Sequence, residues 1–314
     1  MKNYTVRLYN DTDFDLWNEF ITKAKNATFL FHRNFMEYHK DRFDDYSMMV
    51  FCNDKLVSVI PANRVEDKVY SHQGLTYGGL VLDGEDSFND TADIFKAVLS
   101  FLSHHKIVEF QIKELPFFYN SLKSTIEKEI ITNENINIVK KNTILGVDFK
   151  SNFSVSKSKL KHYRRLLDGG LNIKKEDGFE SFWNQILIPL LNEKYRVNPV
   201  HSLAEINYLK SKFEDNIEQY NLYLEDEILA GITIFKTSDV VKSQYGAVSE
   251  KGKKYRALDF LFIYLIEKFK HTYSFFDMGT VDNDSEKGIN EGLLNQKIEL
   301  GCKVYHQNVL QIIL

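Results

Sequence analysis

The segment Phe275–Cys302 reads FFDMGTVDNDSEKGINEGLLNQKIELGC, and it decides how the rest of the chain is interpreted. Its β-rich start ends in Asp277-Met-Gly, and a polar loop punctuated by Gly follows. A short helix is expected over Glu291–Leu300 and a last strand over Lys303–Ile313. Asp277 is thereby placed at the carboxyl end of a strand, where ligands of mixed α/β sheets tend to bind, beside a helix that carries Lys297.

The composition is that of a globular protein. The chain has 314 residues, of which 43% are hydrophobic and 27% charged, so it can hold one large or two ordinary domains. Only 4 Pro and 15 Gly argue against a long linker between domains. A formal net charge of −4 gives no support to broad electrostatic binding of nucleic acid, although a local basic groove can occur in an acidic chain.

The cysteines and the start of the chain indicate in which cellular compartment the protein is expected. Cys52 and Cys302 are too few for a disulfide framework and show no CxxC spacing, so we expect them to be buried thiols in a reducing environment. The histidines are scattered and predict no metal site. The N-terminus has no apolar signal region, and no apolar run approaches the ~18 residues of a membrane span. The expected location is the cytoplasm.

The first half of the chain predicts alternating strands and helices. Asn53-Asp54 is a turn pair between two β-rich runs, which indicates a hairpin, and Asp13 is expected to cap the first helix. The expected elements are strand Tyr4–Leu8, helix Asp13–Ala24, a helix through Phe35–Arg42, strands Tyr46–Cys52, Lys55–Ala62 and Lys68–Ser71, loop Gly74–Gly79, helix Ser87–His104, strand Val108–Ile112, helix Pro116–Ile126 and strand Ile136–Asp148.

The second half predicts a similar order. Ser202 is expected to cap a helix, and Gly169-Gly170 to stop one. The expected elements are helix Ser156–Asp168, strand Leu171–Lys175, helices Phe179–Glu193 and Leu203–Phe213, strands Ile217–Leu224, Ile228–Phe235 and Val240–Val248, helix Tyr255–Lys270, strand Tyr273–Met278, helix Glu291–Leu300 and strand Lys303–Ile313. The alternation indicates an α/β fold with a mixed sheet, in two domains over 1–150 and 151–314.

Five stretches resemble the FemAB/FemX-like acyltransferases, a family with the GNAT (Gcn5-related N-acetyltransferase) fold. The strongest is the terminal segment already quoted; the others are Phe35-Met-Glu-Tyr-His, Ser71-His-Gln-Gly-Leu-Thr-Tyr-Gly-Gly, Tyr163-Arg-Arg-Leu-Leu-Asp-Gly-Gly and Gln244-Tyr-Gly-Ala. The resemblance implies tandem GNAT-like domains, with the donor bound by the second. No heptad run corresponds to the helical coiled-coil arm of some members, which weighs against their aminoacyl-tRNA-dependent chemistry.

The resemblance also implies a reaction: direct transfer of an acyl or aminoacyl group to a primary amine, without a covalent intermediate. It suggests a bacterial enzyme with acceptors from cell-envelope or saccharide biosynthesis. Two alternatives stay open. One is an aminoacyl-tRNA-dependent transferase, for which tRNA would be a partner. The other is a non-catalytic GNAT-like binding protein whose donor site has decayed.

Acyl transfer requires a deprotonated amine and a polarised carbonyl. Asp277 is the preferred acid/base candidate, with His201 as the other residue that would take the ammonium proton. A backbone N–H near Tyr245 and Gly246 would polarise the carbonyl. The structural alternative for Asp277 is a turn carboxylate, because Asp-x-Gly is common at strand ends.

The donor's phosphates would be held at the start of the helix that follows Val240–Val248, since helix N-termini bind anions. The usual GNAT signature is not in register there, so side chains would have to contribute. This predicts binding of acetyl-CoA or another acyl-CoA, or else a merely solvated basic helix start. The residues concerned are Gly252, Lys253, Lys254 and Arg256.

Candidate substrate-binding residues lie in Gly-rich or Pro-stiffened loops, in the central strand, and in the terminal segment. The structural alternatives are packing for Tyr77, a turn between strands for His72, ordinary loop polarity for Arg196, helix capping for Asn290 and a surface position for Lys297. Gln244 could face the cleft while Tyr245 packs, or the reverse. The set is His72, Tyr77, Arg196, Gln244, Asn290 and Lys297.

A basic strip is expected on the helix Ser156–Asp168, from Lys157, Lys159, Lys161, Arg164 and Arg165. Such charge runs are usually solvated. The functional alternative is contact with phosphate on a nucleotide, a lipid carrier or RNA.

Overall fold

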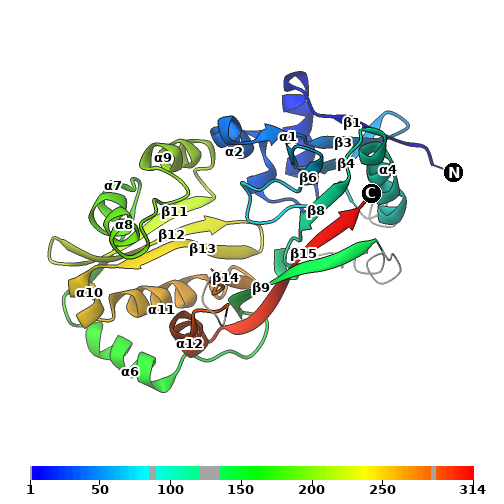
Figure 1. The fold of residues 1–314 in the computed structure, drawn as a ribbon. Helices are drawn as coiled ribbons and strands as arrows, with labels where there is room; N and C mark the ends of the chain where they lie inside the picture. The colour runs from blue at the N-terminus through cyan, green and yellow to red at the C-terminus, as the bar shows by residue number, and fades with distance from the viewer. Residues whose placement is uncertain (1, 85–89, 120–134, 284–287) are drawn as a thin grey trace. The chain divides into compact units, whose positions relative to one another are not determined.

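The computed structural model describes residues 2–84, 90–119, 135–283 and 288–314, and it divides into two compact units (Figure 1). Unit 1 consists of Met1–Asn142 and His306–Leu314, and unit 2 of Thr143–Tyr305. The expected domains, 1–150 and 151–314, have different bounds from these units. That division stays a prediction. No helix in the described ranges is both long and apolar enough to cross a membrane.

Unit 2 is built on a mixed sheet in the order β10-β11-β12-β13-β14-β9. Neighbouring strands are antiparallel except β13 and β14, which are parallel. The strands are β9 (Ile136–Asp148), β10 (Leu171–Glu176), β11 (Ile217–Leu224), β12 (Glu227–Lys236), β13 (Val240–Val248) and β14 (Phe275–Thr280).

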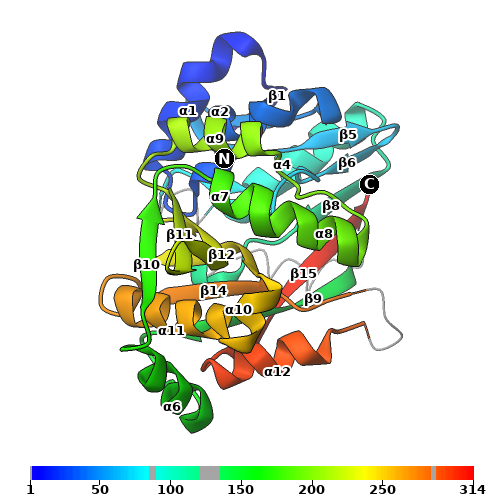
Figure 2. The ribbon, with the colours of Figure 1, turned by 90° about the vertical axis from the view of Figure 1, so that its left-hand side faces the viewer.

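Helices cover both faces of this sheet. Figures 1 and 2 show α11 on one face and α7, α8 and α9 on the opposite face, with α6 and α12 at the α11 side. The helices are α6 (Lys157–Leu166), α7 (Glu180–Phe182), α8 (Ile188–Tyr195), α9 (Leu203–Lys212), α10 (Glu250–Lys254), α11 (Ala257–Phe269) and α12 (Glu291–Glu299).

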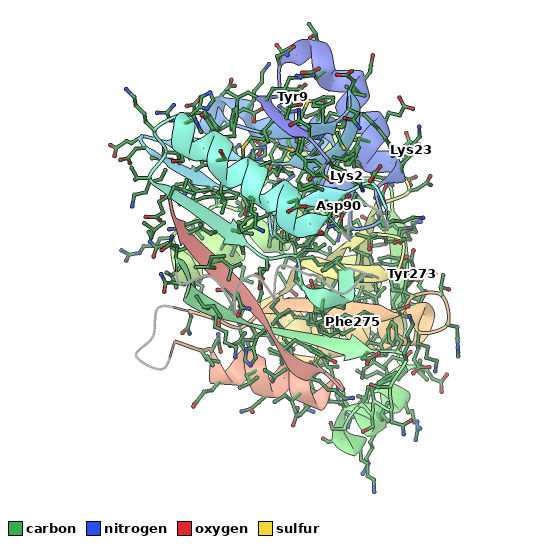
Figure 3. The ribbon with its side chains drawn as sticks, turned by 90° about the vertical axis from the view of Figure 1, so that its right-hand side faces the viewer. Lys2, Tyr9, Lys23, Asp90, Tyr273 and Phe275 are labelled. Carbon is green, nitrogen blue, oxygen red and sulfur yellow. The ribbon has the colours of Figure 1, made fainter. Side chains whose placement is uncertain are left out.

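The core of unit 2 lies between α11 and the sheet. Helix α11 is apolar around most of its circumference, and eight of its residues are buried. Its Leu261 and Leu265 belong to the same cluster as Val241 of β13 and Phe276 of β14. Each such side chain contributes roughly 1.5–3 kcal/mol when fully buried. Phe275 lies at the start of β14 (Figure 3). Its side chain points to the other side of the sheet from Phe276, and its ring packs on that of Tyr305, 5.3 Å between centroids.

Unit 1 contains an antiparallel sheet, β1-β3-β4-β7, and a second strand series, β15-β8-β6-β5-β2. In the second series β6 and β8 are parallel. The strands are β1 (Tyr4–Leu8), β2 (Asp44–Asp45), β3 (Met48–Cys52), β4 (Lys55–Ile60), β5 (Asn63–Val65), β6 (Lys68–Tyr70), β7 (Val81–Leu82), β8 (Glu109–Lys113) and β15 (Lys303–Ile313); the α-helices are α1 (Phe14–Lys23), α2 (Arg33–Met36) and α4 (Thr91–His104).

Helix α4 packs its apolar stripe into the core of unit 1. Ile94, Val98 and Leu102 recur every four residues, as expected for one face of a helix, and are fully buried with Phe110 of β8. Lys2 pairs with Asp90, the residue before α4, at 2.5 Å, which ties the start of the chain to this helix (Figure 3).

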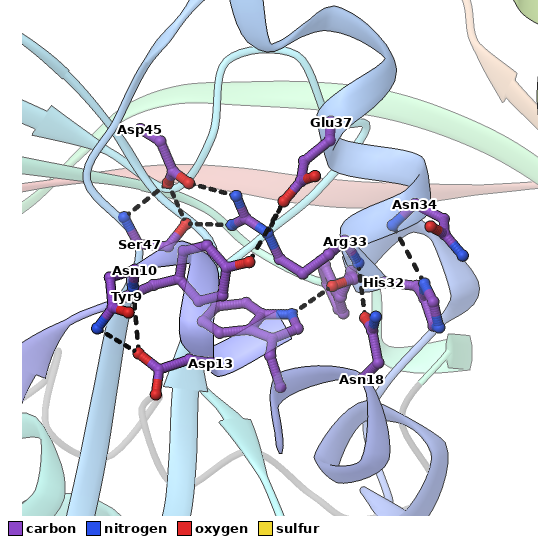
Figure 4. Close-up of polar contacts among 12 residues, drawn as sticks. Tyr9, Asn10, Asp13, Asn18, His32, Arg33, Asn34, Glu37, Asp45 and Ser47 are labelled. Atoms are coloured by element: carbon purple, nitrogen blue, oxygen red, sulfur yellow. Dashed lines mark hydrogen bonds and ion pairs between the residues drawn. The ribbon is translucent and has the colours of Figure 1, made fainter. Parts of the chain in front are cut away.

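Arg33 holds the first helices of unit 1 to the strands beside them (Figure 4). Its guanidinium is 4% exposed, lies 3.8 Å from the Tyr9 ring centroid, and donates to Glu37 and Asp45. Because the charge is both paired and covered by an aromatic face, its burial is compensated.

Strand positions are confirmed more closely than helix ends. Five strands have the expected bounds: Tyr4–Leu8, Ile136–Asp148, Ile217–Leu224, Val240–Val248 and Lys303–Ile313. For the expected helix Pro116–Ile126 the structure describes a 3₁₀ turn, Phe117–Tyr119, and the rest lies outside the described residues, as do residues 87–89 of the expected helix Ser87–His104.

Two expected helices are interrupted in the structure. The expected helix through Phe35–Arg42 is α2 followed by a 3₁₀ segment, because His39 leaves helical geometry at φ −128°. The single helix Phe179–Glu193 is interrupted by a π-helical turn, Trp183–Leu187, just before Pro189, which has no N–H to donate. Arg196 then ends α8 in the left-handed conformation.

Asp13 does not cap α1. The chain enters α1 through a 3₁₀ turn, and the cap of that turn is Asn10, whose backbone N–H donates to Asp13 at 3.1 Å. The Asp13 carboxylate also accepts from Arg7, at 2.5 Å. The Asp13 carboxylate therefore forms its hydrogen bonds with preceding residues and not with the N–H groups of α1.

Gly252 lies where α10 crosses β12 too closely for a side chain. A Cβ at this position would be 2.1 Å from the carbonyl oxygen of Leu229. We expect Gly252→Ala to lower the free energy of unfolding by about 1–3 kcal/mol, the usual cost of overpacking, as measured by urea denaturation. Gly292 of α12 is the control, because a Cβ there meets nothing nearer than 3.5 Å. Gly292→Ala should be neutral or slightly stabilising, and equal losses for the two variants would contradict this packing.

Candidate active site

The two parallel strands of unit 2 part after a short common run. β13 and β14 pair only through Val240–Lys242 and Phe275–Asp277. Beyond Lys242, β13 continues to Val248 without pairing to β14, while its other edge stays hydrogen-bonded to β12. The parting lies at the carboxyl ends of parallel strands, the position where ligands bind in open α/β sheets.

Each of these strands has an extra residue at the parting. In β13, Tyr245 pairs with Thr233 and Ser243 with Ile234, so Gln244 is bulged, and its side-chain Oε1 is buried without a hydrogen-bond partner among the described residues. The register of β14 shifts between Asp277 and Thr280, where Gly279 has φ +74°. Bulges bend a strand away from its neighbour and re-aim side chains, and they are common beside active sites.

Asp277 is the last residue of β14 that pairs with β13. It is 2% exposed, and its Oδ2 lies 3.0 Å from Nζ of Lys242, the residue opposite it on β13. Its Oδ1 accepts the backbone N–H of Gly279 at 2.7 Å. The carboxylate therefore has both an ion-pair partner and the turn contact that the Asp-x-Gly pattern predicts.

Lys297 reaches the same turn from α12. Asn290 caps this helix, since its side chain accepts the N–H of Leu293 at 3.0 Å, as the structural alternative for Asn290 predicts. Lys297 Nζ donates to the carbonyl oxygens of Gly279 and Thr280, at 3.2 and 3.0 Å. The Lys297 side chain is thus held at the end of β14.

The charge of Lys297 is destabilised by its surroundings. Lys297 is 6% exposed, and burial lowers its pKa to about 8. The neighbouring Cys302 and Asp277 oppose this shift, and the ammonium of Lys242 adds to it. A lysine poised near neutral pH in this way is characteristic of functional sites.

Cys302 lies beside Lys297 and is buried as expected. Its Sγ is 2.9 Å from Sδ of Met278, and burial raises its pKa to about 12. Because the thiolate is the nucleophilic form, this thiol is inert at neutral pH.

His201 and Tyr245 form a second group on the same face of the sheet. Thr233 and Phe235 are two residues apart on β12, so their side chains face the same way. They pair with Tyr245 and Lys242 respectively, which therefore also lie on one face of the sheet. His201 Nδ1 is 2.5 Å from the Tyr245 hydroxyl, which also accepts the backbone N–H of His201. Burial raises the Tyr245 pKa, so the hydroxyl stays protonated and shares a hydrogen bond with Nδ1.

The π-helical turn supports this pair. Trp183 is fully buried, its Nε1 donates to the carbonyl of His201 at 3.4 Å, and its ring packs on Tyr245 at 5.2 Å. Trp183 and Lys242 were not predicted from the sequence. Lys242 could have been found, because a lysine between Val241 and Ser243 in a core strand needs a partner for its charge.

The expected phosphate-binding residues divide into two groups. Gly252 donates its N–H to Ser249 Oγ at 3.1 Å, and Lys253 pairs with Glu250, so both have partners in the protein. Arg256 is the left-handed residue before α11, whose first turn has no side-chain cap, and neither Lys254 nor Arg256 has an acidic partner among the described residues. Two cations and an uncapped helix start fit a phosphate group.

His72 lines a cavity of about 220 Å³ in unit 1. It has φ +64°, a strained conformation for this residue, and its Nδ1 accepts the N–H of Gly74. Burial lowers its pKa to about 3, so the ring is neutral. The cavity lies where β6 and β8 end and is lined by Tyr70, Ser71, His72, Gln73, Leu75, Gln111, Lys113 and Val309.

The remaining candidates are apart from these groups. Tyr77 is 1% exposed and donates to Thr28 at 3.1 Å within the unit 1 core. Arg196 is exposed at the end of α8. In the described part of the chain, no group of three or more His, Cys, Asp or Glu residues is placed to hold a metal ion.

No family model and no curated protein sequence matches this chain. Solved structures do match. FemX aligns over 98% of this chain and 97% of its own, with a TM-score of 0.68 and 12% identity. The C-terminal domain of a putative lysylphosphatidylglycerol synthetase from Agrobacterium fabrum aligns over 97% and 92%, with a TM-score of 0.61 and 13% identity.

A third structure, L-PGS from Bacillus licheniformis, aligns over 98% of this chain and 93% of its own, with a TM-score of 0.57 and 16% identity. At these identities the similarity concerns the fold. The expected α/β fold with a mixed sheet is confirmed, and this chain shares the fold of FemX over nearly its whole length.

Proposed function

We propose that this protein is an N-acyltransferase that moves an acyl or aminoacyl group directly to a primary amine where β13 and β14 part. The observation that carries the proposal is Lys297, a buried lysine with a pKa of about 8, beside Asp277 at the ends of these strands. The FemX fold supports it, and the family resemblance supports cell-envelope or saccharide acceptors in a bacterial cytoplasm.

Lys297 would stabilise the negative charge that forms on the carbonyl oxygen. Two of its ammonium N–H groups are used by the Gly279 and Thr280 carbonyls, and the third is left for the reacting oxygen. A preorganised donor in a site with little water is worth more than the same donor in solution. The backbone N–H groups along the unpaired edge of β13 near Tyr245 would add to it.

Asp277 would accept the proton of the acceptor's ammonium group. The free amine then attacks the carbonyl carbon, a C–N bond forms, and the C–S or C–O bond of the donor breaks. The amine nitrogen loses its second proton to the leaving group, so protons balance. His201 is less suited to be the base, because its Nδ1 is already occupied by Tyr245, and the pair would instead form a wall of the site.

The donor would be an acyl-CoA, which supplies an activated thioester carbonyl. Lys254, Arg256 and the start of α11 would hold its phosphates. The second candidate is an aminoacyl-tRNA donor, favoured by the match to a lysylphosphatidylglycerol synthetase. Because Gly252 and Lys253 have partners within the protein, a binding module without activity is the third outcome to test.

Thermal shift measurements separate these donors. We expect acetyl-CoA or a longer acyl-CoA to raise the melting temperature, since a ligand at a hundredfold excess over its Kd adds about 2.7 kcal/mol. Lys254→Ala/Arg256→Ala should abolish the shift, whereas Lys212→Ala/Lys268→Ala, two exposed lysines of α9 and α11, should not. A shift with aminoacyl-tRNA alone would favour the second candidate, and no shift with either would leave a binding module.

Lys297 is expected to be essential for transfer. Lys297→Met should lower kcat by about 10²–10³-fold, as for loss of an oxyanion donor, with little change in KM. Lys303→Met is the control, because Lys303 is an exposed lysine of the same segment. The measurement is a transfer assay with the donor identified above. Unchanged kcat in Lys297→Met would exclude this role.

The pKa of Lys297 also predicts a pH dependence of stability. The folded pKa, about 8, is below the ordinary value of 10.5, so the unfolded chain binds more protons between these values and stability rises with pH there. The free energy of unfolding of the wild type, relative to Lys297→Met, should therefore grow from pH 8 upward, by at most about 3 kcal/mol. Denaturation at a series of pH values measures it, and a constant difference would show that the lysine is not desolvated.

A further inference from the structure

Helix α6 exposes a stripe of cations that the proposed reaction does not use. Lys157, Lys161, Arg164 and Arg165 are all exposed. At 3.6 residues per turn, these positions fall within about 100° of the helix circumference. We call these four residues the basic stripe.

The opposite face of α6 is firmly attached to unit 2. Lys159 is 6% exposed and pairs with Asp259 of α11 at 2.5 Å and with Glu299 of α12 at 3.3 Å. His162 Nε2 is 3.0 Å from the Tyr255 carbonyl oxygen. The helix is thus held in one orientation, with the stripe directed away from the core; Figures 1 and 2 show α6 at the edge of unit 2.

The basic stripe is not neutralised within the protein. None of its four side chains forms an ion pair with an acidic residue in the parts of the chain that the structure describes, and the Arg165 guanidinium contacts only the His162 ring, at 2.8 Å. Asp168, just beyond the helix, is the nearest carboxylate along the chain. Because the whole chain has a formal net charge of −4, this concentration of positive charge is local.

An exposed apolar side chain follows the stripe along the chain. Leu167, the residue after α6, is 52% exposed. Tyr163 of α6 is turned inward, with its ring 4.6 Å from that of Phe260. The four residues of the basic stripe themselves offer no aromatic ring on which a nucleic-acid base would stack.

We propose that α6 docks on the surface of a bilayer that contains anionic phospholipid. Cations beside an exposed apolar side chain fit such an interface, where Lys and Arg meet anionic headgroups and Leu167 enters the boundary of the acyl chains. The attachment is peripheral and reversible. It is independent of the acyl transfer proposed above, because it uses none of the residues assigned to that reaction.

Vesicle co-sedimentation with the full chain tests this. The protein should bind vesicles of phosphatidylcholine mixed with phosphatidylglycerol, but not phosphatidylcholine alone, and added salt should release it. Each cation removed should weaken binding about fivefold, so Lys157→Gln/Lys161→Gln should cost about 25-fold. The matched control is Lys212→Gln/Lys268→Gln, which removes the same charge from α9 and α11 and should leave binding intact.

Two results would overturn the proposal: equal binding to both kinds of vesicle, or equal loss in the α6 and control variants. Vesicles that never bind, together with RNA binding that depends on the same four cations, would assign the stripe to RNA instead. Melting temperatures confirm that the variants fold. Transfer to a soluble amine should be unchanged in Lys157→Gln/Lys161→Gln, so failure of this proposal and failure of the proposed reaction are distinguishable.

Discussion

The ion pair between Lys242 and Asp277 lies at the last residue pair that β13 and β14 share, and the candidate site depends on it. Two charges this well buried require each other, because either alone would carry a large desolvation cost. The pair therefore fixes where the parallel strands stop running together. Beyond it, β13 is bulged at Gln244 while it stays paired with β12, and the turn at Gly279 presents two carbonyl oxygens to Lys297. Removing one of the two charges would therefore disturb the place where β13 and β14 separate.

Unit 1 also has two parallel strands that pair over a short run, with different side chains at their ends. β6 and β8 are also parallel and pair through three residues each, and the chain then leaves β6 through the strained His72. The ends of these strands hold a neutral imidazole and carboxamides where unit 2 has an ion pair and a buried lysine. The same topology thus gives one unit a charged site and the other a largely uncharged cavity. Element order suggested a repeat, and the strand register supports it.

The sequence predicted features that local chemistry controls. The bounds of β11 and β13 were predicted from the sequence. Asp-Met-Gly predicted a strand that ends at Met278, whereas β14 runs on to Thr280 and Asp277 is the last of its residues to pair with β13. The features that were missed depend on distant partners. The bulge at Gln244 exists only relative to β12, the π-helical turn at Trp183 follows from packing on Tyr245, and the lowered pKa of Lys297 comes from burial by segments far along the chain. No local pattern encodes these.

The last nine residues belong to unit 1, which has a consequence for the order of folding. β15 pairs with β8, and Leu310 and Ile312 are almost fully buried in the unit 1 core. During synthesis, the residues of unit 2 are complete while unit 1 still lacks one of its strands. The usual sequence in which the N-terminal part of a chain folds first is therefore reversed. Until residue 306 and those after it emerge from the ribosome, β8 has an open edge, and chaperones have the longest access to the half of the protein that was made first.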